Sequence, residues 1–281
     1  MRIGAHVFTP RGPVSGIENA LEVGAEAIQF FASNPRAWAS RVIPPATATE
    51  FRQRMDADGV GPAFIHVTYL VNVASPKPEF REKSVDAAIA DLVAAEALGA
   101  AGLVVHSGSA GAGTPRAEAV ARSTETILRI AEHAGETELL VELTAGTAGS
   151  VAATIPEAAE LFASIGDHPR VALCLDTCHL FAAGYALDEP EGVRACFAEI
   201  RDLGLESRLR LIHANDAAFP RGSRRDRHTN IGTGGIGETG FRAILGDPAV
   251  RRTSVLVETP GRRDDHRRDV ETLKRLAEEA G

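Results

Sequence analysis

Short apolar segments recur along the chain at intervals of roughly 35 residues. Most are continuous and rich in β-branched residues, as expected for strands that are buried on both faces. Stretches with helical spacing of apolar positions lie between them. Eight segments have this strand-like character: residues 3–7, 27–31, 63–67, 102–105, 138–141, 171–175, 209–212 and 254–257.

The clearest helical patterns cover residues 78–98, 114–133, 154–165 and 264–280. Gly99 and Gly166 follow two of them and are typical helix ends, because glycine adopts the left-handed conformation at little cost. Eight alternating strand and helix units predict a (β/α)8 TIM barrel of the α/β class, with a doubly wound open sheet as the alternative. No linker-like segment interrupts the chain, so we expect a single domain over residues 1–281.

Each of the last six predicted strands ends in a histidine or an acidic residue. The carboxyl ends of barrel strands form the mouth of the barrel, where active sites lie. Burying so many ionisable groups without metal ions would be very costly. In chain order these residues are His66, His106, Glu142, Asp176, His213 and Glu258.

Three further residues of metal-ligand type follow these strands. His179 comes three residues after Asp176, and Asp226 and His228 have the i, i+2 spacing that directs two side chains the same way. Imidazole and carboxylate together suit zinc, manganese or iron. A catalytic zinc takes about three protein ligands, so nine indicate three metals, or two with a bridging carboxylate. Such a cluster suits hydrolysis of a phosphate ester.

The formal net charge of -8 argues weakly against a nucleic-acid partner. Bound cations would change the field at the site, and arginines cluster beside Asp226. These arginines are Arg221, Arg224, Arg225 and Arg227. No apolar window is long enough to span a bilayer, and the first ten residues lack the apolar core of a signal peptide. We therefore expect no membrane partner and a cytoplasmic protein.

The remaining histidines and the cysteines have simpler interpretations. His6 is expected at the mouth as a hydrogen-bonded neighbour of the ligands. Cys174 lies inside a predicted strand, so we favour packing over metal binding for it and for Cys178. The segment GTGGIG at 232–237 is expected to form a tight loop that returns His228 to the site. The other histidines are expected to be solvated: His133, His168 and His266.

With these residues in view, the chain resembles the endonuclease IV family of apurinic/apyrimidinic endonucleases (deoxyribonuclease IV). The resemblance covers nearly the whole chain, and its last four segments are highly specific as a set. The matching segments are GAHV at 4–7, HVTYLVNVASP at 66–76, VVHSG at 104–108, VELTAG at 141–146, CLDTCHLFAAGY at 174–185, HAND at 213–216, GSRRDRHTNIGTGGIG at 222–237 and VETP at 257–260.

The resemblance implies a barrel that holds three zinc ions per chain, with manganese as an alternative at one or more sites. It implies that His66 and His106 hold one ion and that Glu142 bridges it to a second. The second ion would be completed by Asp176, His213 and Glu258, and the third would be held by His179, Asp226 and His228. Glu142 and Glu258 are the catalytic residues that we expect on this basis.

The resemblance also implies contacts to DNA from two loops at the mouth. Arg36 and Trp38 match one family loop that probes the DNA, and Tyr69 and Leu70 match a second. Five residues depart from the family pattern. None of them is a metal ligand, so we expect these departures to affect DNA affinity and not the chemistry. They are Thr68, Leu143, Thr147 and the pair Ala217-Ala218, where the family has a serine and a lysine.

The sequence therefore predicts a zinc-dependent endonuclease that cleaves duplex DNA on the 5′ side of abasic sites and leaves a 3′-hydroxyl, for base excision repair. We expect a monomer, associated with the nucleoid when it acts. The alternatives are a metal-dependent sugar isomerase or epimerase on the same barrel, and a DNA-binding barrel that has lost activity. The third ligand set argues against the first alternative, and the intact ligands argue against the second.

Overall fold

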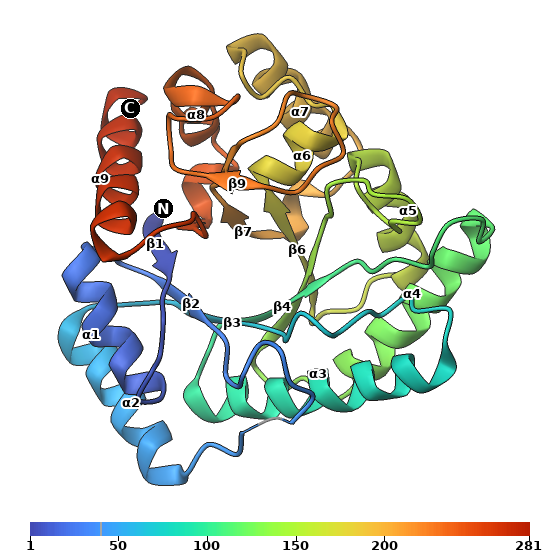
Figure 1. The fold of residues 1–281 in the computed structure, drawn as a ribbon, viewed down its shortest axis with the longest axis horizontal. Coiled ribbons are helices and arrows are strands. Elements are labelled where there is room, and N and C mark those ends of the chain that lie inside the picture. The colour runs from blue at the N-terminus through green and yellow to red at the C-terminus, as the bar shows by residue number, and fades with distance from the viewer. Residues whose placement is uncertain (40) are drawn as a thin grey trace.

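The computed structural model describes residues 1–39 and 41–281. Eight parallel strands close into a barrel, in which β1 pairs with both β2 and β10 (Figure 1). The predicted (β/α)8 barrel is confirmed, and the open sheet is wrong because the ring of described strands is closed. The barrel strands are β1 (Arg2–His6), β2 (Ile28–Phe30), β3 (Ala63–His66), β4 (Gly102–His106), β5 (Glu138–Glu142), β6 (Val171–Asp176), β7 (Leu209–His213) and β10 (Ser254–Val257).

Helices cover the outside of the barrel (Figure 1). The four predicted helices are confirmed to within two residues at each end, and Gly99 ends α3 in the left-handed conformation, with φ 68°. In the described residues, no helix is long and apolar enough to cross a membrane. The helices are α1 (Pro13–Val23), α2 (Pro45–Asp58), α3 (Pro78–Leu98), α4 (Arg116–Ala131), α5 (Ile155–Ile165), α6 (Thr177–Ala183), α7 (Pro190–Asp202), α8 (Gly237–Gly246) and α9 (Arg263–Glu279).

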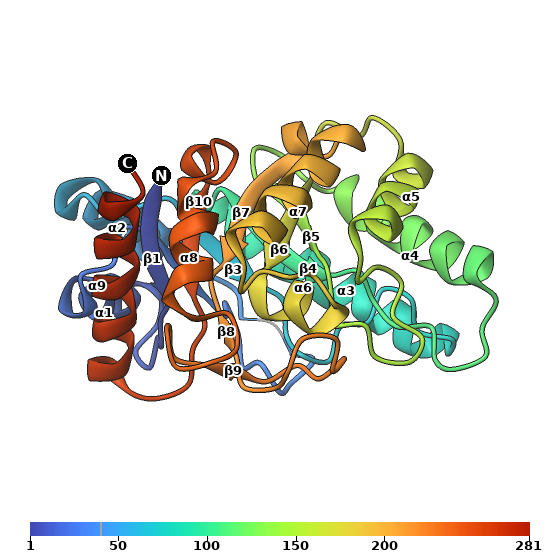
Figure 2. The same cartoon turned by 90° about the horizontal axis from the view of Figure 1, so that it is seen from above.

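A short antiparallel pair outside the barrel follows β7. It joins β8 (Asp216–Ala217) to β9 (His228–Thr229), with Ala217 opposite His228. Figure 2 shows this pair at one end of the barrel, beside α6. Through this pairing the loop between β8 and β9 folds back, and His228 lies at the mouth of the barrel.

Apolar side chains fill the inside of the barrel directly below the predicted ligands. Residues two apart on a strand share a face, so Leu140 lies below Glu142 and Cys174 below Asp176. The same spacing relates one interior residue to one ligand on β3, β4, β7 and β10. The ligands therefore stand on a closed apolar floor. The buried interior cluster comprises Ala27, Phe64, Val104, Leu140, Ala172, Cys174, Leu211 and Leu256.

The close approach of β1 to the chain before β2 depends on Gly4. A Cβ atom at this position would overlap the carbonyl oxygen of Ala27, which cannot rotate away because it belongs to the backbone. We expect Gly4→Ala to lower the free energy of unfolding by about 3 kcal/mol or more, measured by urea denaturation.

Gly246→Ala is the matched control, because an added Cβ there meets only ordinary contacts at 3.5 Å and beyond. It should leave stability unchanged or raise it by up to about 1 kcal/mol, because glycine in a helix is less favourable than alanine. Equal stabilities of the two variants would contradict the packing that we describe between β1 and β2.

Candidate metal centre

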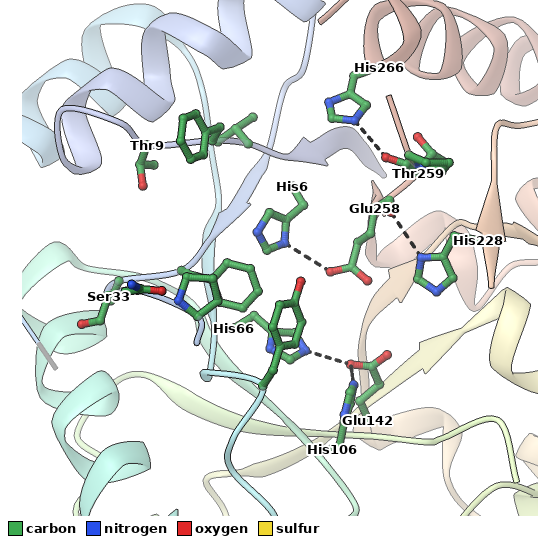
Figure 3. A pocket seen from close by; sticks show the side chains of 18 of the residues that line it. His6, Thr9, Ser33, His66, His106, Glu142, His228, Glu258, Thr259 and His266 are labelled. Atoms are coloured by element: carbon green, nitrogen blue, oxygen red, sulfur yellow. Dashed lines mark hydrogen bonds and ion pairs between the residues drawn. The ribbon is translucent and has the colours of Figure 1, made fainter. Parts of the chain in front are cut away.

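A cavity of about 900 Å³ opens at the carboxyl ends of the strands. Seven of the nine predicted ligands line it, and Figure 3 shows His66, His106 and Glu142 facing Glu258 and His228 across it. The other two, Asp176 and His213, are fully buried beside this lining. The structure thus brings all nine residues to one end of the barrel, as the sequence predicted.

Glu142 lies at the centre of this group, with a side chain only 1% exposed. Its Oε2 is 3.4 Å from Nε2 of both His66 and His106. Its Oε1 is 3.2 Å from Nδ1 of His213 and 3.3 Å from Nδ1 of His179. Neither carboxylate oxygen has a hydrogen-bond partner among the described residues. A buried carboxylate with four imidazoles around it and no such partner is suited to cations held between these groups.

Among the described residues, five sets of side chains have donor atoms within 4.8 Å of one another; two include Cys174 or Cys178, and the other three consist of predicted ligands alone. Glu142 belongs to two of these three sets, so it is placed to bridge two cations. The grouping matches the one that the resemblance implied. The sets are His66, His106 and Glu142; Glu142, Asp176, His213 and Glu258; and His179, Asp226 and His228.

Hydrogen bonds to backbone carbonyls fix the orientation of three of the histidines. Nδ1 of His66 donates to the carbonyl of Val67 at 2.8 Å, and Nδ1 of His179 to that of Leu143 at 2.8 Å. Nδ1 of His228 donates to the carbonyl of Glu258 at 3.2 Å. In each case Nε2 is directed at the cavity, where it can bind a metal ion once its proton has been displaced.

The second set is positioned by residues that the sequence did not single out. Asn215 donates to Oδ2 of Asp176 at 2.7 Å and accepts the backbone N–H of Glu258 at 2.7 Å. Gln29 donates to Oε1 of Glu258 at 2.5 Å and its amide oxygen lies 2.9 Å from Nε2 of His213. These contacts join strands that are far apart in the sequence, so only the folded chain reveals them.

His6 contacts the same carboxylate, as expected for a neighbour of the ligands. Its Nδ1 lies 3.3 Å from Oε1 of Glu258. The prediction that His266 is solvated is wrong, because its side chain lines the cavity and Nε2 contacts the carbonyl of Thr259 at 2.9 Å. His266 lies on the inner side of the first turns of α9, an orientation that sequence spacing did not resolve.

The direction of the pKa shifts at these groups reflects strong interactions among them in the absence of cations. Burial disfavours the charged form of His228, but Asp176 and Asp226 outweigh it and raise its pKa to about 9. Burial is likewise outweighed at Glu142, where His213 and His106 hold the pKa well below its usual range. The protein therefore holds positive charge among these carboxylates even when only protons are present.

The two cysteines near the ligands are poorly suited to metal binding. Burial raises the pKa of both thiols, Cys174 and Cys178, to about 12. Cys174 Sγ lies 3.8 Å from Nδ1 of His213 and belongs to the apolar interior of the barrel. These observations support the packing role that the sequence predicted.

The tight loop around 232–237 is organised by Asp216, which the sequence did not single out. Its carboxylate accepts the backbone N–H groups of Gly232, Gly234 and Ile236 at 2.9 to 3.0 Å. A side chain at Gly234 would collide with this carboxylate. The loop is therefore wrapped around one buried anion directly beyond the strand that presents His228.

The four residues predicted to contact DNA occupy different environments at the mouth. Tyr69 lines the cavity and is 65% exposed, with its ring 5.0 Å from that of Phe31. Leu70 is 37% exposed and Arg36 is exposed, both outside the cavity lining. Trp38 packs against Phe80, with ring centroids 6.4 Å apart.

Two of the departures from the family pattern have structural roles. The Thr68 hydroxyl donates to the carbonyl of Pro35 at 2.7 Å, so it ties together the two loops that carry the predicted DNA contacts. Leu143 buries its side chain, and its carbonyl accepts the hydrogen bond from His179. Thr147 and Ala218 are exposed, and in the described part of the chain neither contacts a candidate ligand.

Comparisons with known proteins agree on the family and on the fold of this chain. A family model described as xylose isomerase-like TIM barrel matches residues 17–277. A protein named probable endonuclease 4 from Methanoculleus marisnigri is 42% identical over 99% of this chain and 99% of its own length. The crystal structure of endonuclease IV from Thermus thermophilus has a TM-score of 0.87 at 35% identity, covering 99% of this chain and 100% of that one. A D-tagatose 3-epimerase-like protein, at 19% identity and a TM-score of 0.76 over 100% of this chain and 98% of its own, shares the fold alone.

The raised pKa of His228 links the stability of the metal-free protein to pH. Folded His228 keeps its proton up to about pH 9, whereas an unfolded histidine loses it near 6.5. Its contribution is therefore complete below about pH 6.5 and is lost as the pH rises through about 9. We expect chelator-treated protein to lose roughly 3 kcal/mol of unfolding free energy over this range in urea titrations.

The lowered pKa of Asp226 does not offset this loss. Its stabilisation is complete above the unfolded pKa of about 4 and disappears only as the pH falls further. His228→Gln should make the decline above about pH 6.5 shallower without abolishing it, because the pKa values of His179 and His213 are also raised, while His133→Gln, at an exposed position, should leave it unchanged. A stability of the parent protein that rises towards pH 9 would show that these groups are not paired as described.

Proposed function

The chain belongs to the endonuclease IV family, which makes it a hydrolytic endodeoxyribonuclease, and on this premise we propose its substrate and cofactor. It is a zinc-dependent enzyme that hydrolyses the phosphodiester 5′ to an abasic nucleotide in duplex DNA and leaves a 3′-hydroxyl, for base excision repair. The observation that carries this proposal is the position of Glu142, whose two unpartnered oxygens lie between separate groups of histidines in the described chain.

We assign one zinc to each of the three donor sets. His66, His106 and Glu142 would hold the first, and Glu142 would share the second with Asp176, His213 and Glu258. His179, Asp226 and His228 would hold the third. The mixture of imidazole and carboxylate, together with thiols kept protonated by burial, favours zinc and admits manganese at one or more of these positions.

Zinc at these positions would lower the pKa of water and offset the charge that develops on the phosphate. The chain itself supplies a rigid and dry setting for this chemistry. Glu142 and Glu258 are the catalytic carboxylates, and Glu258 is held by Gln29 and His6 so that it cannot turn away from the cavity. The apolar floor below the ligands excludes water from beneath and strengthens each electrostatic contact.

The rim residues complete the proposed substrate site. An abasic nucleotide has to leave the stack to bring its phosphate to the cavity, and the cost is lowest where no base pair must be broken. Tyr69 and Leu70 are exposed beside the cavity and are placed to fill the space that the nucleotide leaves in the DNA stack. Arg36 contacts the phosphate backbone, and Trp38 fixes the Arg36 loop through Phe80.

The second candidate function is a sugar isomerase or epimerase, which the shared barrel alone favours. The third donor set supports the endonuclease over the isomerase. His179 Nε2 and His228 Nε2 both lie 3.2 Å from the carboxylate of Asp226, which reaches the cavity from the loop after β7. One or two ions suffice for a sugar isomerase, so a third set is better explained by phosphate-ester hydrolysis. We propose that the enzyme acts as a monomer on cytoplasmic, nucleoid-associated DNA.

Glu142→Gln tests this proposal directly. An amide cannot balance two cations, so cleavage of a labelled abasic duplex should fall by more than about a hundredfold, which exceeds the usual effect of changing a neighbour of a metal ligand. The circular dichroism spectrum should be unchanged. The parent protein should hold about three zinc ions, should cut the duplex once on the 5′ side of the lesion, and should leave an end that a polymerase extends.

Glu136→Gln is the matched control, because the Glu136 side chain is 94% exposed on the surface. It should cut abasic duplex at the parent rate. Turnover of aldose sugars by the parent protein without cleavage of abasic duplex would replace the proposal with the isomerase. Activity of Glu142→Gln within about tenfold of the parent, or about 1.4 kcal/mol in the barrier, would show that Glu142 is not a bridging ligand.

A further inference from the structure

One half of the cavity contains none of the candidate metal ligands. It is formed by the loop after β1 and the loop after β2, and Figure 3 shows Thr9 and Ser33 on this side, away from His228 and Glu142. Phe8 and Arg41 line the same half. Phosphate hydrolysis at the metal centre does not require these two side chains, so their position in the cavity lining indicates a different role.

Phe8 is an aromatic side chain without a partner. It is 78% exposed although it lines the cavity, whereas Phe31 and Tyr69 in the same lining pack against each other. No ring or cation contact to Phe8 occurs in the described residues. A phenyl ring left in water beside a deep polar cavity gains free energy when a flat apolar surface covers it.

The loop that carries Phe8 is held firmly to α1. The Asn19 side chain donates to the carbonyl of Phe8 at 2.6 Å, and the Gly12 N–H donates to the carbonyl of Thr9 at 3.1 Å. Gly16 lets α1 approach, since a Cβ there would lie only 3.0 Å from the Thr9 methyl group. The exposed ring is therefore presented by a fixed backbone and is preorganised for a ligand.

Arg41 supplies a cation in the same half of the cavity. Its backbone N–H donates to Ser33 Oγ at 2.6 Å, and its Nη1 lies 4.0 Å from the position that a Cβ on Gly12 would occupy. Within residues 1–39 and 41–281, no carboxylate pairs with its guanidinium. An unpaired guanidinium and an exposed aromatic ring in one half of a cavity match the two parts of a nucleotide, a phosphate and a base.

We propose that Phe8 and Arg41 form a nucleotide subsite that binds the DNA strand next to the lesion, with the flanking base stacked on Phe8 and its phosphate on Arg41. The inference rests on the proposed function and adds a residue-level account of how the strand is held. Stacking on Phe8 is insensitive to base identity and to salt, whereas the Arg41 contact releases a counterion. The contributions of the two residues can therefore be separated by the salt dependence of binding.

Steady-state cleavage of abasic duplex by the zinc-loaded enzyme tests the subsite. Phe8→Ala should raise KM about tenfold, within the range measured for loss of one stacked base, and leave kcat within about twofold. Phe8→Trp should keep the parent KM. Phe8→Leu should raise KM nearly as much as Phe8→Ala does, because stacking needs a π-face. Arg41→Ala should raise KM and reduce the slope of log KM against log salt by about one.

Two controls separate the subsite from general surface effects. Val42→Ala removes an apolar side chain that is 88% exposed and lies outside the cavity lining, and Arg194→Ala removes an arginine on α7. Both should behave as the parent. Unchanged KM in Phe8→Ala and Arg41→Ala, with normal cleavage by the parent, would overturn the subsite alone. A parent protein that leaves abasic duplex intact would contradict the proposed function and the subsite together.

Discussion

The structure depends on a carboxylate that the fold buries without giving it a hydrogen bond. Glu142 stands on the apolar interior of a closed barrel, and both of its oxygens lack a partner among the described residues. Imidazoles face this carboxylate, so its negative charge is balanced by the protons or cations that these rings bind. Protons do this in the metal-free protein, and divalent ions would do it better because each brings two charges. The rest of the mouth serves to keep these donors in place.

Much of this arrangement was predictable, because two simple regularities of strands fix it. Apolar runs set which strands are buried, and residues two apart share a face, so Leu140 below Glu142 places the carboxylate at the mouth. The i, i+2 spacing of Asp226 and His228 likewise predicted that both reach one site, and His179 Nε2 meets Asp226 there. Barrel class and the candidate ligand set follow from such local patterns without any long-range information.

Other features depend on contacts between residues far apart in the sequence, and the sequence did not reveal them. Gln29 on β2 and Asn215 after β7 both hold Glu258, and their polar side chains carry no distinguishing spacing. Asp216 stands out in the sequence only as part of a motif, and its role in organising the glycine loop appears once the loop is closed around it. His266 faces the cavity because of how α9 is rotated about its own axis against β10. Hydrophobic periodicity does not fix this rotation closely enough to predict the direction of one side chain.

The positions of the three proposed ions test the central claim most directly. Crystals of protein purified without added metal should be measured on both sides of the zinc absorption edge, and an anomalous difference map calculated. Our account predicts three zinc peaks, two on opposite sides of the Glu142 carboxylate and one among His179, Asp226 and His228. A single peak, or three peaks of which none lies beside Glu142, would contradict the claim that this buried carboxylate bridges two cations.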